Sequence, residues 1–226
     1  MNLLVVIPAY NEEASLANTV AELIATCPDV DFLVVNDGST DATEQVCIEH
    51  DIRHLRMPIN TGLASVFRCG MKYALRHDYD AVVQFDADGQ HMPEYIIPMA
   101  EALEEQDADV VIASRVLAGE GPVGMRSVGS KLISWLIRAT TGTKITDPTS
   151  GMRMYNRQMI EMFATGFDIQ PEPDTVAFVL RHGKRVVEIP ARMRERQGGE
   201  SYLTLGKSIG YMLRASLSIL LYQWLR

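Results

Sequence analysis

The sequence predicts a single α/β domain built on a mostly parallel sheet, and three observations support this prediction. Short apolar runs rich in Val and Ile alternate with amphipathic helical patterns through the first half of the chain. Strands that alternate with crossover helices form parallel sheets covered on both faces. The 226 residues are 47% hydrophobic, and we find no internal repeat or linker-like stretch, so one domain is favoured over two.

Five strands are predicted from their apolar, β-branched content. LLVVIPA opens the chain, DFLVVND, IRHLRM and DAVVQFD follow, and DADVVIASR closes the series. These strands cover residues 3–9, 31–37, 52–57, 80–86 and 107–115. The first run is short and has no basic segment before it, so we interpret it as a strand rather than a signal peptide.

A helical pattern follows each of the first four strands. The predicted helices cover residues 12–26, 40–50, 61–77 and 93–105. Glu12 and Glu13 are expected in the first turn of the first helix, where carboxylates suit the helix dipole. Pro93 is expected near the start of the fourth. Residues 206–226 predict an amphipathic C-terminal helix that follows a domain at residues 1–205.

The net charge of −8 is unevenly distributed along the chain. Residues 181–226 carry nine Lys/Arg and three Glu, a charge of +6, so the preceding residues carry −14. An acidic body with a basic tail is not typical of nucleic-acid binding, and it suits an anionic ligand or surface near the C-terminus. The three cysteines form no CxxC or Cys/His cluster, which argues against zinc or disulfides and favours a reducing, cytoplasmic setting.

The segment FDADGQH carries the strongest chemical signal. Asp86 and Asp88 lie two residues apart, so on an extended chain both point to the same side, with Gln90 as a third oxygen donor. An all-oxygen set of this kind suits Mg²⁺ or Mn²⁺. A single Asp after a strand is more often a turn or helix cap, so the pair carries the metal hypothesis. Because parallel strands end at one edge, we expect this segment to share a cleft with Asp37 and Arg115.

Other nucleotide-binding and hydrolase motifs are missing from the sequence. There is no GxxxxGK[ST], no GxGxxG after the first strand and no GxSxG. The ordered set VVIPAYNEE, VVNDGSTD, Asn60-x-Gly62 with Gly70, FDADGQH, ASR and DPTSGMR instead resembles the family 2 glycosyltransferases of the GT-A fold. Within them it is most similar to the dolichyl-phosphate mannose synthases and bacterial polyprenyl-phosphate glycosyltransferases.

This resemblance covers roughly residues 3–205 and implies inverting transfer from a UDP- or GDP-linked sugar to polyprenyl (undecaprenyl) phosphate in a cell-envelope pathway. It also implies roles for individual residues. Metal ligation falls to Asp86, Asp88 and Gln90. Donor binding falls to Pro8, Tyr10, Glu12, Asp37, Gly62, Asp86 and Arg115. His91 is either a further metal or phosphate contact or an ordinary polar residue at a helix entry.

The catalytic carboxylate stays open at this point. Asp147 in TDPTSGMR matches the family position usually assigned to catalysis; an Asp-Pro turn is the alternative, and the resemblance favours the catalytic role. Glu172 and Asp174 in QPEPD are rivals. A lipid phosphate is already an anion, so this acceptor depends less on a base for proton removal than a hydroxyl does. For acceptor-phosphate contact the candidates are Lys131, Arg196 and Ser201, the last two in an R-x-x-G-x-S signature.

The apolar stretch at residues 215–225 is about half as long as the ~20 residues of a spanning helix. It either packs on the domain or lies at a membrane surface with Tyr222 and Trp224 at headgroup level. We favour the second interpretation, which predicts a peripheral protein on the inner face of the cell membrane. A small membrane-protein partner and a homo-oligomer remain open. Two alternative functions are direct extension of a cell-surface polysaccharide and non-catalytic binding of a nucleotide-sugar.

Overall fold

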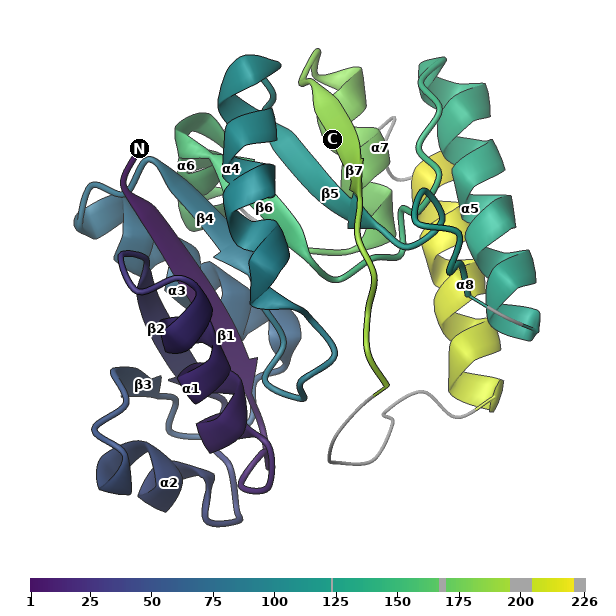
Figure 1. Cartoon of the computed structure of the whole chain (residues 1–226). Helices are drawn as coiled ribbons and strands as arrows, with labels where there is room; N and C mark the ends of the chain where they lie inside the picture. The colour runs from purple at the N-terminus through teal and green to yellow at the C-terminus, as the bar shows by residue number, and fades with distance from the viewer. Residues whose placement is uncertain (123, 167–169, 196–204, 222–226) are drawn as a thin grey trace.

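The computed structural model builds one sheet in the order β3-β2-β1-β4-β6-β5-β7 (Figure 1). It describes residues 1–122, 124–166, 170–195 and 205–221. The strands are β1 Leu3–Ala9, β2 Asp31–Asn36, β3 His54–Arg56, β4 Ala81–Gln84, β5 Val110–Ser114, β6 Arg153–Asn156 and β7 Val186–Pro190. Neighbouring strands run parallel except at β6, which is antiparallel to both β4 and β5. The predicted mostly parallel sheet is confirmed.

Helices cover both faces of the sheet (Figure 1). One face carries α1, α2 and α4, and the other carries α3, α5, α6, α7 and α8. The helices are α1 Leu16–Thr26, α2 Thr43–Glu49, α3 Leu63–Arg76, α4 Ile96–Glu105, α5 Met125–Thr141, α6 Arg157–Thr165, α7 Pro173–Arg181 and α8 Leu205–Leu220, with a 3₁₀ turn, η1, at Pro93–Tyr95.

Strand β1 shows why the N-terminal run is apolar without alternation. Leu4 and Val6 belong to the core on the α3 side, whereas Val5 and Ile7 belong to the core on the α1 side. All four side chains are fully buried. A strand covered on both faces needs apolar residues at every position, which is what the sequence provides.

The first helix begins later than predicted. It starts at Leu16, so the expectation that Glu12 and Glu13 lie in its first turn is wrong. Asn11 adopts a left-handed backbone conformation with φ 56°, and the carbonyl of Glu12 then accepts the N–H groups of Ser15 and Leu16 in a turn. This turn delays the helix by one turn of chain.

Helix α8 packs along α5 and α7, and Figure 1 shows α5 and α8 side by side at the end of the molecule farthest from α2. Ala215 and Ile219 are buried in the core on this face, and the Arg181 guanidinium donates to the Ile219 carbonyl at 2.9 Å. The division into residues 1–205 and 206–226 stays a prediction. Tyr222 and Trp224 lie outside the described residues. In the part of the chain that is described, no helix has the length and apolarity needed to cross a membrane.

Candidate active site

The predicted site segments meet at one edge of the sheet. β1, β2 and β4 are parallel neighbours, and β5 runs in the same direction because β6 is antiparallel to both β4 and β5. Tyr10, Asp37, Asp86 and Arg115 follow the carboxyl ends of these four strands. The prediction that these strand ends share one edge is confirmed.

Asp37 fixes the loop that precedes α3. Its Oδ1 accepts the N–H and hydroxyl of Thr61 at 2.8 and 2.9 Å, and its Oδ2 accepts the N–H of Gly62 at 2.8 Å. Gly38 has a φ of 65°, and a Cβ there would lie 2.6 Å from the carbonyl carbon of Ile59. The end of β2 therefore packs directly on this loop, and Asp37 joins the two.

The segment after β1 forms the neighbouring wall. Pro8, Tyr10 and Glu12 are half-buried at this edge. The Glu12 carboxylate accepts the Ser15 hydroxyl at 2.6 Å, while its N–H donates to the Thr43 hydroxyl at 2.9 Å. These three residues, which the resemblance implies in donor binding, therefore lie at the same edge as Asp37, and their roles in binding stay predictions.

The DAD segment lies in a loop and not on a strand, because β4 ends at Gln84. The extended-chain reason given for pairing the aspartates is therefore wrong, although both follow β4 directly. The Asp86 side chain is 36% exposed, whereas Asp88 is buried and accepts the Gln90 N–H at 3.0 Å.

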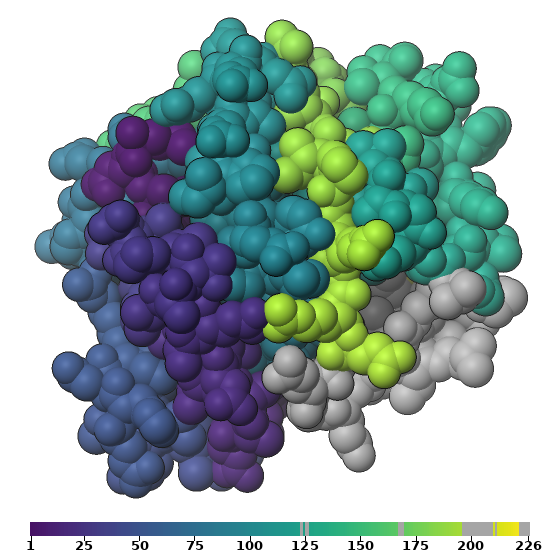
Figure 2. Space-filling view, viewed as in Figure 1, coloured from purple at the N-terminus to yellow at the C-terminus, as the bar shows by residue number. Residues whose placement is uncertain are grey.

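The segment after β7 holds Gln90 in place. Its carbonyl accepts the Arg194 N–H at 3.0 Å, and its side-chain amide donates to the Arg194 carbonyl at 3.4 Å. Arg194 forms a two-point ion pair with Glu22 on α1, at 2.8 and 2.7 Å. Figure 2 shows this yellow-green segment crossing the surface to meet the purple N-terminal part. A C-terminal segment thus closes one side of the DAD loop.

The donor set of this loop fits a hard divalent cation. Two carboxylates and an amide oxygen suit Mg²⁺ or Mn²⁺, which leave positions for phosphate oxygens. Glycine at position 151 lets the loop before β6 approach Asp86 closely, since a Cβ there would lie 3.3 Å from Asp86 Oδ2. Across the described residues, no three His, Cys, Asp or Glu side chains converge on one point. A cation here would need ligands besides the protein carboxylates.

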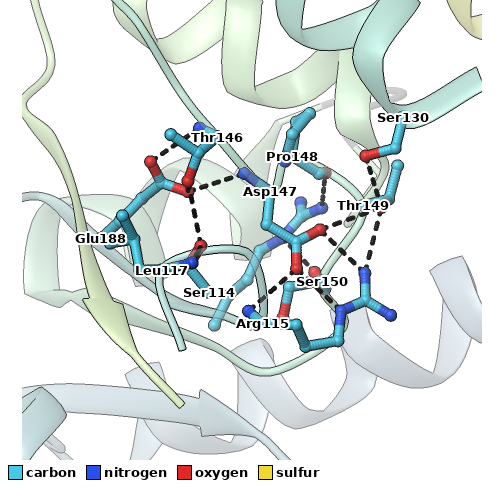
Figure 3. Close-up of polar contacts among 11 residues, drawn as sticks. Ser114, Arg115, Leu117, Ser130, Thr146, Asp147, Pro148, Thr149, Ser150 and Glu188 are labelled. Atoms are coloured by element: carbon cyan, nitrogen blue, oxygen red, sulfur yellow. Dashed lines mark hydrogen bonds and ion pairs between the residues drawn. The ribbon is translucent and has the colours of Figure 1, made fainter. Parts of the chain in front are cut away.

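Arg115 and Asp147 form a tight ion pair at the end of β5 (Figure 3). Arg115 Nε donates to Asp147 Oδ2 at 2.7 Å and Nη2 donates to Oδ1 at 2.8 Å. The Arg115 N–H adds a third bond to Oδ2 at 3.1 Å. The Asp147 side chain is 0% exposed and that of Arg115 is 24% exposed. The pair therefore buries the anion and presents part of the cation.

The pKa of Asp147 is lowered from its ordinary value of 3.8. Burial acts to raise this pKa, but hydrogen bonds and charge from Arg115, with a further hydrogen bond from Thr149, outweigh it. The carboxylate is therefore ionised at neutral pH, with its oxygens already occupied. A general base must have an oxygen that reaches the proton it removes, so this geometry favours a positioning role.

A second carboxylate stabilises the chain that carries Asp147 (Figure 3). Glu188 on β7 accepts the N–H of Thr146 at 2.7 Å, its hydroxyl at 2.9 Å and the N–H of Asp147 at 2.8 Å. The Thr146 hydroxyl also lies 3.0 Å from that of Ser114 on β5. Glu188 thus fixes the backbone of Asp147, and Asp147 fixes Arg115.

The two rival carboxylates differ in their surroundings. Glu172 is the half-buried N-cap residue of α7, and its carbonyl accepts an Arg153 N–H at 3.2 Å. Asp174, in the first turn of α7, accepts the hydroxyl of Ser218 on α8. Asp174 therefore ties α8 to α7, while the Glu172 backbone contacts Arg153 on β6.

The predicted acceptor contacts are only partly described. Lys131 is exposed on α5, whereas Arg196 and Ser201 lie outside the described residues. The neighbouring Ser130 is buried, and its hydroxyl lies 3.3 Å from that of Thr149.

Sequence analysis missed Glu188, Ser130, Thr146 and Thr149 as members of this cluster. A charged residue inside the apolar run VVEIP was the one available signal, and it pointed to Glu188.

Comparison with known proteins identifies the family of this chain. A family model described as glycosyl transferase family 2 matches residues 4–163, well over half of the chain. The chain belongs to glycosyl transferase family 2. As a family 2 member it is a glycosyltransferase, and the structural neighbours show that its fold is GT-A. This confirms the resemblance inferred from the motifs.

Two curated relatives of this family 2 chain share about a third of its residues. An undecaprenyl-phosphate mannosyltransferase of Micrococcus luteus is 34% identical, with 91% of this chain and 89% of that protein covered. A polyprenol monophosphomannose synthase of Mycolicibacterium smegmatis is 33% identical, with 89% and 80% covered.

A solved structure with the same fold is glucosyl-3-phosphoglycerate synthase from Mycobacterium tuberculosis, in complex with Mn²⁺, uridine diphosphate and phosphoglyceric acid. Its TM-score is 0.69 at 19% identity, with 98% of this chain and 78% of that chain covered. At this identity, the likeness concerns the fold alone.

Proposed function

We propose that this family 2 glycosyltransferase moves a sugar from a UDP- or GDP-linked donor to polyprenyl phosphate. One observation carries the proposal: the inner side of α5 contacts the Arg115 cluster, and the outer side of the same helix exposes apolar side chains. On its inner side, buried Ser130 contacts Thr149, and the Thr149 hydroxyl accepts a hydrogen bond from Nη2 of the Arg115 guanidinium at 3.1 Å. A lipid phosphate has a matching pair of groups: a phosphate that Arg115 could bind and an apolar chain that the outer side of α5 could contact.

The outer side of α5 and its neighbour α8 is apolar and basic. Val128, Leu132 and Trp135 follow each other at helical spacing on α5, and Trp135 is 63% exposed. α8 and the residue that follows it carry a matching exposed set, Leu213, Leu217, Leu220 and Leu221. Exposed cationic side chains stand on the same two helices: Lys131, Arg138 and Arg214. We call these ten residues the α5–α8 surface.

The α5–α8 surface has the composition of an interfacial helix pair, with large apolar side chains for the acyl region and cations for anionic headgroups. We place it on the inner face of the cell membrane. There the lipid tail would stay in the bilayer while its phosphate reaches Arg115. A carbohydrate acceptor would gain nothing from these exposed leucines, which is why the lipid is preferred over the polysaccharide alternative.

The resemblance implied donor binding for Arg115, but we assign this residue to the acceptor phosphate. Asp147 and Thr149 occupy Nε and Nη2, and within the described residues Nη1 donates to no acceptor. In an inverting displacement, an acceptor phosphate oxygen forms a bond to the anomeric carbon, while the bond to the diphosphate oxygen breaks and its electron pair stays on the leaving diphosphate. Because the phosphate oxygen is already ionised, no proton has to be removed from it.

The donor would bind across the other half of the edge. Tyr10 and Asp37 would contact the nucleoside, and Asp86, Asp88 and Gln90 would hold Mg²⁺ or Mn²⁺. The cation, when bound, neutralises negative charge on the leaving diphosphate. The names of the two curated relatives support a polyprenyl-linked acceptor, and family membership argues against a non-catalytic subunit.

The decisive experiment offers the protein both acceptor classes in parallel. Purified protein is incubated with Mn²⁺ and a panel of UDP- and GDP-sugars, with undecaprenyl phosphate in one series and an oligosaccharide in the other. We expect one donor to be consumed only with the lipid phosphate, read as a glycosylated lipid by mass spectrometry. Transfer to the oligosaccharide alone would replace the proposal with the polysaccharide alternative.

A further inference from the structure

His91 is buried beneath the DAD loop. Its side chain is 2% exposed and meets the Phe85 ring edge-on, with ring centroids 5.6 Å apart. The sequence left open whether His91 is a metal or phosphate contact or an ordinary polar residue at a helix entry, and its burial favours a place behind the loop over direct phosphate contact. The ring instead faces the first aspartate of the loop.

Hydrogen bonding fixes the tautomer of this ring. The backbone N–H of Asp86 donates to His91 Nδ1 at 2.9 Å. Because a backbone N–H can only donate, Nδ1 carries no proton, and the proton of the neutral ring must sit on Nε2. Nε2 lies 3.5 Å from Asp86 Oδ2. The imidazole therefore contacts Asp86 twice, at its main chain and at one carboxylate oxygen.

Gly151 completes the surroundings of that oxygen. A Cβ at this position would lie 3.3 Å from Asp86 Oδ2 and 3.5 Å from His91 Nε2. The loop before β6 thus packs against the same carboxylate oxygen that faces the imidazole. Asp86 Oδ2 therefore lies close to both His91 and Gly151, while the side chain as a whole stays 36% exposed.

We propose that His91 is a positioning residue that turns Asp86 Oδ2 inward and so aims Oδ1 at the cleft, where a divalent cation would bind. The inference rests on the metal role of Asp86 in the proposed function. Groups that orient a ligand from behind typically change metal affinity about 10- to 100-fold when they are replaced. In this proposal the Nε2–H of His91 orients the Asp86 carboxylate, while Nδ1 accepts the Asp86 N–H and fixes the backbone of the DAD loop.

Two substitutions separate these contacts. In His91→Asn the amide oxygen can take the place of Nδ1, so the bond from the Asp86 N–H survives, but no group reaches Oδ2. In His91→Gln the amide N–H can take the place of Nε2–H, so the contact to Oδ2 survives. Thr19→Val is the matched control, because Thr19 is also buried and its hydroxyl donates at 3.0 Å to the carbonyl of Ala87 in the same loop, not to Asp86.

The measurement is Mn²⁺ affinity by electron paramagnetic resonance, in the presence of UDP or GDP, with thermal unfolding as the check on folding. We expect His91→Asn to weaken Mn²⁺ binding about tenfold or more, the range for residues behind a metal ligand. His91→Gln and Thr19→Val should stay within about threefold of wild type, well below that range. NMR of ¹⁵N-labelled histidine should show the Nε2–H tautomer for His91.

Several results would overturn the inference. Wild-type affinity in His91→Asn would do so, as would a Thr19→Val loss of the same size, which would mean that affinity reports loop stability alone. If His91→Asn does not fold, a tenfold loss in His91→Gln overturns it, while retained affinity supports it. A wild-type protein that binds no Mn²⁺ overturns both this inference and the metal assignment. A protein that binds Mn²⁺ but transfers no sugar overturns the proposed function alone.

Discussion

The two halves of the site differ in the charge that they present. At the DAD loop, Asp86 keeps a carboxylate that is one-third exposed, so this half offers negative charge to the cleft. At the end of β5, Asp147 is wholly buried against Arg115, so this half offers positive charge. The first half can bind a diphosphate only through a cation, whereas the second can bind a phosphate directly.

The two halves also differ in how the chain builds them. The DAD loop takes its oxygens from five consecutive residues, while α1 and the segment after β7 hold the loop in place. The Arg115 cluster joins β5, the 146–149 loop, β7 and α5, which are far apart in the sequence (Figure 3). The comparison teaches that one half draws its ligand oxygens from a local motif, whereas the other half is assembled from residues that only the tertiary fold brings together.

Removing the cation should produce the largest effect and tests the first half alone. Chelation should lower sugar transfer on the order of 100-fold or more, because a Lewis acid at the leaving group contributes several kcal/mol. Asp88→Asn should do the same at constant fold. Product formation with and without chelator, then with Mn²⁺ or Mg²⁺ added back, measures it.

Asp78→Asn is the control for this substitution, because Asp78 is an exposed aspartate paired with Arg157 far from the edge. It should transfer sugar at the wild-type rate. Full transfer in excess chelator would mean that the reaction needs no cation at the DAD loop, and the negative charge of this loop would need another explanation.

How far the sequence predicts this molecule follows the same division. The alternating runs predict β1 to β5 because each strand and helix carries its own local pattern. Strand β6 was not predicted, since RMYN contains polar residues and pairs antiparallel between two distant strands. Such a pairing depends on contacts made across the fold, which no local window contains.

The site repeats this contrast residue by residue. The positions of Asp37 and Asp86 at one edge follow from strand order, so they were predictable. The bidentate pair of Asp147 with Arg115 was not, because 32 residues separate the partners in sequence. Glu188 is still farther away, and its partners became visible only in the fold. Sequence therefore identified Asp147 as a functional candidate without its partner.

The next largest effect should separate positioning from base catalysis at Asp147. If Asp147 acts by holding Arg115, Asp147→Asn and Arg115→Met should each raise the KM for polyprenyl phosphate about 10- to 100-fold, the size of a charged hydrogen bond of 1.5–3 kcal/mol. The double variant should be little worse than either single one. Steady-state kinetics with the acceptor varied measure this.

A loss of kcat at unchanged acceptor KM in Asp147→Asn alone would instead restore the base assignment. The pH dependence of the unfolding free energy gives an independent test of whether Asp147 is held as a carboxylate. Because the folded-state pKa of Asp147 is lowered, its stabilisation is present above 3.8 and is lost as pH falls through the lower folded value. The stability gap between wild type and Asp147→Asn should therefore be constant from pH 7 to about pH 5, and should shrink only below pH 3.8.

A smaller effect should appear at the α5–α8 surface, which tests whether the positive half faces lipid. Leu132→Ser with Trp135→Ser, or Leu213→Ser with Leu217→Ser, should weaken binding to anionic vesicles by at least about tenfold, since burying even one such side chain is worth about 1.5–3 kcal/mol. Vesicle co-sedimentation measures this. Ile48→Ser is the control, because Ile48 is equally exposed on α2, away from both helices.

These substitutions replace a simpler truncation of residues 215–226. Truncation would remove Ile219, which is 0% exposed in the core, and would unfold the protein for reasons unrelated to lipid. Unchanged vesicle binding in both double variants would mean that the α5–α8 surface contacts something other than lipid.

The smallest effects are expected at Glu172 and Asp174, and their size decides what kind of acceptor the positive half receives. A general base that removes a proton contributes about 10²- to 10⁴-fold. A phosphate acceptor needs no such base, so Glu172→Gln should lower kcat less than tenfold, below that range. Asp174→Asn keeps an oxygen for the Ser218 hydroxyl and should change neither rate nor stability, whereas Ser218→Ala should cost about 1 kcal/mol of unfolding free energy at unchanged kcat. Stopped-assay kinetics and thermal unfolding of the three variants supply the comparison. A loss above 100-fold in Glu172→Gln would mean that the acceptor oxygen starts with a proton, which is the chemistry of a sugar hydroxyl and of the polysaccharide alternative.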